Sequence, residues 1–136
     1  MCYSPPMNRK ELGDKKLPFR YYDHDPRELL TRTDADVLLV LDAMVEQNRL
    51  DTHVAEALLT LAAYTKVKRP AVAQQALNVF AGLVKNHIQE RKIRQIIDIT
   101  FSGRHLSTPD SFREVLVHAA SELPANHETY IYLDQK

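Results

Sequence analysis

From Thr33 onward, apolar residues recur at the spacing of one face of an α-helix. Over residues 34–47 they stand one, four, seven and eight positions after the first of them, a pattern typical of a helix with one buried side. These residues are Val37, Leu38, Leu41, Met44 and Val45. The same pattern continues over residues 52–66, 70–86, 89–101 and 107–122. The sequence therefore predicts an all-α fold, with a helical domain of about five helices over residues 34–123.

Residues that favour helix ends separate these segments. Thr33 and Asp51 (or Thr52) are good helix caps, Pro70 suits a first helical turn, and Pro124 stops the last helix. The links between segments are on the order of four residues, and short links make successive helices antiparallel neighbours. We therefore expect a stack of helical hairpins.

A shift of 38 residues superimposes parts of this domain. It places Leu39 on Leu77 and on Val115, Ala43 on Ala81 and on Ala119, and Asn48 on Asn86. In spacing alone the pattern resembles the TPR, HEAT and armadillo classes of α–α repeats, although their sequence signatures are absent. The alternative is a plain five-helix bundle whose equal spacing is a coincidence. The alanines at equivalent positions indicate places where two helices approach closely.

The two ends of the chain differ from the helical domain. Residues 1–33 hold four of the seven prolines, which predicts an extended arm with one short helical turn that starts at Asp25 and Pro26. Residues 124–136 are rich in strand formers, and we expect one short strand or an ordered extended tail there.

Several chemistries are not expected. The three glycines are scattered, so the glycine-rich loops that bind nucleotide phosphates are missing. The one cysteine, Cys2, cannot form a disulfide within the chain and lies far from any organised base. Glu114, His118 and Glu122 share one helix face, but a di-iron bundle needs Glu-x-x-His pairs, so we expect an exposed face with weak side-chain pairing. We predict no enzyme activity, no metal and no cofactor.

Charge is balanced overall, with 18 basic and 18 acidic residues, but it is unevenly distributed. Residues 66–94 hold seven bases against one acid, which makes them the candidate for binding an anionic partner such as RNA or DNA. The candidate residues are Lys66, Lys68, Arg69, Arg91, Lys92 and Arg94. The helix between the two groups separates them by roughly 24 Å, and few aromatic residues stand near them to stack on bases. Lysine and arginine at helix C-termini also have a simpler explanation in the helix dipole.

Aromatic residues cluster in both terminal segments, at positions outside the predicted helical core. Tyrosine and arginine are favoured at protein interfaces. The candidate partner-binding residues are Phe19, Arg20, Tyr21, Tyr22, Tyr130 and Tyr132. The alternative is that both segments fold back and cover the open ends of the chain's own helix stack.

Together these patterns favour a non-catalytic protein–protein interaction module, a small adaptor or a subunit of a larger assembly, with one or more protein partners. The alternative is a helical repeat protein that binds nucleic acid through residues 66–94. No secretory signal and no apolar run of bilayer length are found, so we expect no membrane insertion and an intracellular location, cytoplasmic or in an organellar matrix.

Overall fold

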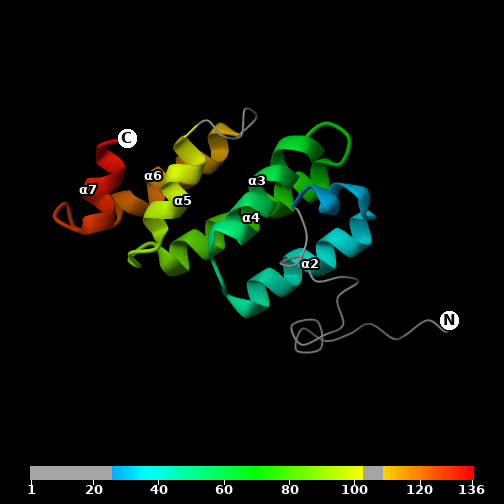
Figure 1. Cartoon of the computed structure of the whole chain (residues 1–136), viewed down its shortest axis with the longest axis horizontal. Coiled ribbons are helices and arrows are strands. Elements are labelled where there is room, and N and C mark those ends of the chain that lie inside the picture. The colour runs from blue at the N-terminus through cyan, green and yellow to red at the C-terminus, as the bar shows by residue number, and fades with distance from the viewer. Residues whose placement is uncertain (1–25, 103–108) are drawn as a thin grey trace.

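The computed structural model describes residues 26–102 and 109–136, and within these the chain is helical without strands (Figure 1). The all-α prediction is therefore confirmed. The elements are the 3-10 helix η2 (Pro26–Thr31) and the α-helices α2 (Asp34–Gln47), α3 (Thr52–Thr65), α4 (Pro70–His87), α5 (Ile93–Phe101), α6 (Asp110–Ser121) and α7 (Glu128–Asp134).

The helix starts follow from the capping residues. The Thr33 hydroxyl accepts a hydrogen bond from the Asp36 amide at 3.2 Å, and the Asp51 carboxylate accepts one from the Val54 amide at 2.9 Å. Pro70 occupies the first turn of α4, where its missing N–H costs nothing. Helix α2 ends at Gln47, and the next residue, Asn48, has a left-handed backbone (φ 48°) that turns the chain toward α3.

The helices form two layers, in which neighbours of one layer stand two places apart in the chain, and the most extensive packing, between α3 and α4, joins the layers. Helix α4 packs on both α2 and α6, and α5 packs on both α3 and α7. Helix α3 also packs on α4, which joins the layers, and η2 packs on α3. Figure 1 shows the result, an elongated stack with α2 toward one end and α7 at the other.

One apolar core runs through this stack. Its largest fully buried side chains come from η2 and from helices α2 to α6: Leu29 in η2, Met44 in α2, Leu59 in α3, Phe80 in α4, Ile96 in α5 and Phe112 in α6. The rings of Phe80 and Phe112 meet with their centroids 4.4 Å apart, which fixes α4 against α6.

The C-terminal tail corrects the expected strand. Residues Glu128–Asp134 form α7, so the described chain holds six α-helices, one more than the sequence predicted. Thr129 and Leu133, four residues apart, are both buried on one face, and His127 caps the helix by accepting a hydrogen bond from the Thr129 amide. Packing on one face therefore overrides the strand preference of the aromatic and β-branched residues here.

Two helix starts lie later than expected. Helix α5 begins at Ile93 instead of Gln89, because the chain first makes a turn over residues 88–92. Helix α6 begins at Asp110, directly after Pro109. In the expected N-terminal arm, the short helical turn is the 3-10 helix Pro26–Thr31, whereas Asp25 and the residues before it lie outside the described residues.

Candidate protein-binding groove

The aromatic residues of the tail face their own chain. Tyr132 donates a hydrogen bond from its hydroxyl to the Asp98 carboxylate in α5, and its ring lies 5.3 Å from the Arg94 guanidinium. Tyr130 is half-buried and packs against the core. The other four aromatic-arm candidates, Phe19, Arg20, Tyr21 and Tyr22, lie outside the described residues.

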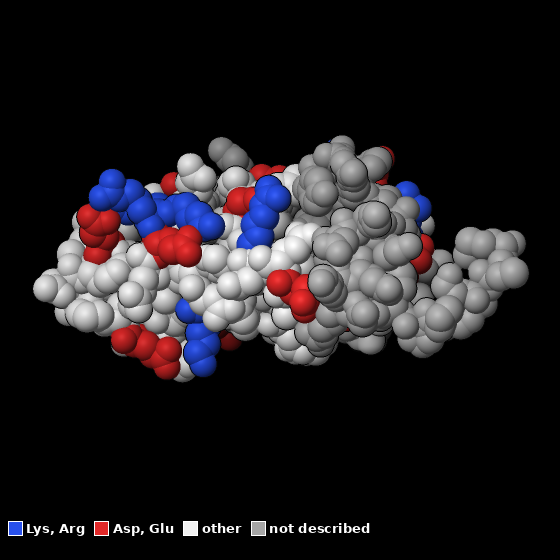
Figure 2. All heavy atoms as spheres, turned by 90° about the horizontal axis from the view of Figure 1, so that it is seen from below, with Lys and Arg blue, Asp and Glu red and all other residues white. Residues whose placement is uncertain are grey.

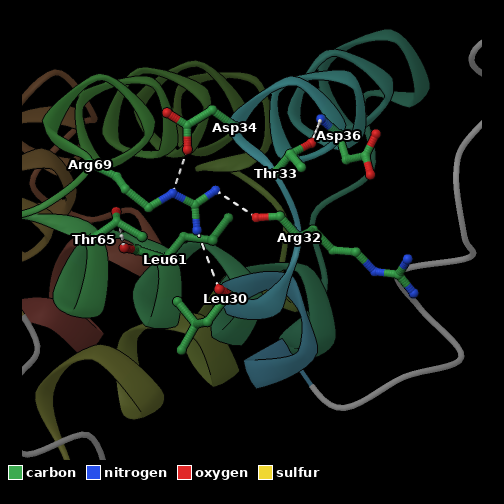
Figure 3. A network of polar contacts seen from close by, with 8 residues as sticks. All are labelled: Leu30, Arg32, Thr33, Asp34, Asp36, Leu61, Thr65 and Arg69. Atoms are coloured by element: carbon green, nitrogen blue, oxygen red, sulfur yellow. Dashed lines mark hydrogen bonds and ion pairs between the residues drawn. The ribbon is translucent and has the colours of Figure 1, made fainter.

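Arg69 is tied into the fold as the residue before α4. Its guanidinium forms an ion pair with Asp34 and donates hydrogen bonds to the carbonyl oxygens of Arg32 at 2.9 Å and Leu30 at 3.3 Å (Figure 3). Only 20% of its side chain is exposed. Three acceptors from η2, the link after it and the start of α2 thus hold one guanidinium, which leaves little of it for an external anion.

The two lysines near Arg69 in the sequence, unlike Arg69, are exposed to solvent. Lys66 and Lys68 are exposed in the turn between α3 and α4. Tyr64 and Val67 beside them are also exposed, at 63% and 89%. The first basic group therefore offers two lysines to solvent instead of three cations.

The second basic group is matched by acids of the same chain. Arg91 and Arg94 both approach Glu128 of α7, at 3.6 and 3.4 Å, and Lys92 approaches Glu90 at 3.1 Å. Figure 2 shows basic and acidic side chains interspersed over the described part of one face. The structure places the two basic groups at opposite ends of α4, so it does not bring them together.

The bends between helices carry a polar cluster that the sequence did not single out as a site. His87 is buried, with Nδ1 2.7 Å from a Glu90 carboxylate oxygen and Nε2 2.9 Å from the Asn48 carbonyl oxygen. Hydrogen bonds from His87 and Lys92 hold the pKa of the Glu90 carboxyl below its usual value. Each polar group has a partner within the fold, so the cluster fastens one bend to the next.

A groove between α4 and α6 is the most promising recognition feature of the described surface. Its floor comes from Leu77 and Ala81 of α4 and from Val115 and Ala119 of α6, and this hollow encloses about 400 Å³. A second hollow of about 460 Å³ shares Leu77, Ser111 and Glu114 with the first and continues toward Pro70. The two hollows therefore form one groove along α4, which we call the α4–α6 groove.

The floor of this groove uses positions that the 38-residue shift had aligned. Leu77 falls on Val115 and Ala81 on Ala119. The repeated alanines predict points of close helix approach. The structure shows in addition that small side chains at these positions hollow the surface between the two helices. The signal was present in the sequence, but it did not show which side of the helix pair would lie open.

The rims of the groove differ in charge. The α6 rim carries Glu114, His118 and Glu122, all exposed, and the end of the α4 rim carries Lys85. Among the described residues neither Glu114 nor Glu122 takes part in an ion pair. The predicted face with weak pairing is thus the acidic rim of the α4–α6 groove.

Within residues 26–102 and 109–136, no three histidine, cysteine, aspartate or glutamate side chains gather closely enough to hold a metal ion. No helix of the described chain has the apolar length that crossing a bilayer takes. Comparison with protein-family models, with curated proteins and with solved structures gave no match.

Proposed function

We propose that this chain is a non-catalytic protein–protein interaction module, a small adaptor or a subunit of a larger assembly, that binds its partner in the α4–α6 groove. The observation that carries the proposal is the open apolar floor formed by Leu77, Ala81, Val115 and Ala119. A groove of this kind between two packed helices can bury apolar side chains of a partner, and each buried methylene contributes about 0.8 kcal/mol.

The alternative function, nucleic-acid binding through residues 66–94, has less support. Arg69 is held by three acceptors of its own fold, and Arg91 and Arg94 share Glu128. Phosphate binding gains its free energy from cations that release counterions, and cations already paired with carboxylates contribute less. Lys66, Lys68 and Lys85 are the exposed cations of this segment that remain for this function.

A pull-down from the native host tests the proposal. The tagged wild type is compared with Ala81→Arg, which places a long charged side chain in the groove, and with Gln89→Arg, which adds the same charge in the exposed turn after α4. Half of each sample is treated with nuclease, bound proteins are identified by mass spectrometry, and circular dichroism checks that each variant is folded.

Three outcomes are distinguished. Partners that survive nuclease, are lost with Ala81→Arg and are kept with Gln89→Arg support the proposal. Partners that bind Ala81→Arg as well as the wild type contradict the groove as the site. Binding that disappears with nuclease and with Lys66→Gln/Lys68→Gln favours nucleic acid instead.

A further inference from the structure

The shape and charge of the α4–α6 groove indicate what kind of partner segment fits in it. This inference rests on the proposed function. We infer that the partner presents an amphipathic helix, with its apolar face on the groove floor and arginine or lysine residues along the flank that faces α6.

Shape is the first argument for a helix. The groove is bordered by two helices, and the ridge of side chains on a third helix fits the channel between two others. Helix α6, which carries most of the acidic rim, has 12 residues, so at ~1.5 Å per residue it is about 18 Å long, which matches three turns of a bound helix. The described residues contain no strand, so they offer no sheet edge to which an extended peptide could add.

The apolar floor is the second argument. Its four side chains, Leu77, Ala81, Val115 and Ala119, supply no hydrogen-bonding group. An extended or irregular peptide laid on it would leave backbone N–H and C=O groups without partners, which costs free energy. A helix satisfies these groups internally and places only side chains on the floor.

The charges on the two rims indicate which flank of the partner helix is basic. Glu114 lies in α6 and Glu122, eight residues later, directly follows this helix, which places them about 12 Å apart along the rim. Basic residues seven or eight positions apart on a partner helix have the same separation and can face both carboxylates. Lys85 at the end of the opposite rim disfavours a cation on the other flank, so the two flanks of the partner differ.

Selection from a helical peptide library tests this inference. Peptides of about four turns, with leucine and alanine fixed along one face and both flanks randomised over arginine, lysine, glutamate and glutamine, are displayed on phage and selected on the full chain. We expect arginine and lysine to be enriched on one flank, at positions seven or eight apart. A selected peptide should lose about three- to tenfold in affinity for the Glu114→Gln/Glu122→Gln variant. It should bind Glu46→Gln, a change on exposed α2 surface, as tightly as the wild type.

Failure of the inference and of the proposed function give different results. Peptides that are selected without a charge preference, and are displaced by Ala81→Arg, would overturn the basic flank and leave the groove as a binding site. If no helical peptide is selected while host partners are still lost with Ala81→Arg, the helical occupant is wrong. If selected peptides bind Ala81→Arg unchanged, both the inference and the groove proposal are wrong.

Discussion

The side-chain amide of Asn86 donates a 2.9 Å hydrogen bond to the side-chain oxygen of Asn48, the residue 38 positions earlier. The two residues are equivalent under the shift found in the sequence: Asn48 directly follows α2, and Asn86 lies in the last turn of α4, a helix of the same layer. The next residue, His87, contacts the Asn48 carbonyl oxygen from the same side of the bend. Successive helical hairpins are therefore fastened at matching positions.

This relationship predicts coupling between the two asparagines. Asn86→Ala should lower the free energy of unfolding by about 0.5–1 kcal/mol, because it removes one hydrogen bond between exposed side chains. Asn48→Gly keeps the left-handed backbone that position 48 requires and removes the same bond from the other side. Urea unfolding of both single variants and the double variant measures the coupling, and strictly additive effects would show that the bond contributes nothing.

Arg69 should matter for stability well beyond the other bases of its group. Arg69→Gln removes an ion pair and leaves the carbonyl groups of Leu30 and Arg32 without their donor, so we expect a loss of about 2–3 kcal/mol. Arg69→Lys should restore little of this, because an ammonium cannot reproduce the planar fork that reaches three acceptors. Lys68→Gln, at an exposed neighbouring position, is the matched control and should change stability by less than about 0.5 kcal/mol in thermal or urea unfolding.

The cap of α3 should make part of the stability depend on pH. Burial acts to raise the pKa of Asp51, but hydrogen bonds from the Val54 amide and the Arg49 side chain outweigh it, and the pKa lies below its ordinary value of 3.8. Because the folded-state pKa is the lower one, the carboxylate stabilises the fold above the unfolded-state pKa, and this contribution is lost as the pH falls through the folded-state pKa.

Asp51→Ala should therefore lower the free energy of unfolding by about 1 kcal/mol at neutral pH, and by less in acid, below about pH 4. Asp51→Asn keeps an oxygen that can cap the helix but does not titrate, so it should flatten this dependence while retaining part of the stability. Urea unfolding across the acid range checks both variants. An Asp51→Ala deficit that is equally large in acid would argue against the carboxylate as the stabilising group.

Gly82 offers a gain in stability. It lies inside α4, and a Cβ atom built at this position meets nothing within 4 Å. Gly82→Ala should therefore raise the free energy of unfolding by about 0.5–1 kcal/mol, because it reduces the conformational freedom of the unfolded chain without a clash. Thermal unfolding measures the gain, and an unchanged or lower melting temperature would refute the prediction. The variant also serves as a stabilised background for substitutions in the groove.

Local sequence patterns predict most of the helices. The features that could not be predicted depend on contacts between residues far apart in the chain. Thr33, Asp51 and Pro70 act through neighbours within a turn, so the starts of three helices could be found by inspection. Arg69 was placed among anion-binding candidates because nothing nearby shows that Asp34, 35 residues earlier, holds it.

Helix α7 was missed for a related reason. This segment is rich in residues that favour strands, but it is helical because it packs on α5 and α6, and no local pattern indicates these contacts. The α4–α6 groove could be predicted only in part. The 38-residue shift aligns its two alanines, whereas the side of the helix pair that lies open depends on how the two helices pack.

The helices also pack in a way that affects how the chain folds. Every principal contact joins elements no more than two places apart in the chain. Relative contact order is therefore low, and helical proteins of this kind fold in microseconds to milliseconds, because little loop-closure entropy is lost before contacts form. During synthesis η2 and helices α2 to α4 can assemble while the last helices are still within the ribosome, and each later helix then adds to a surface that is already complete.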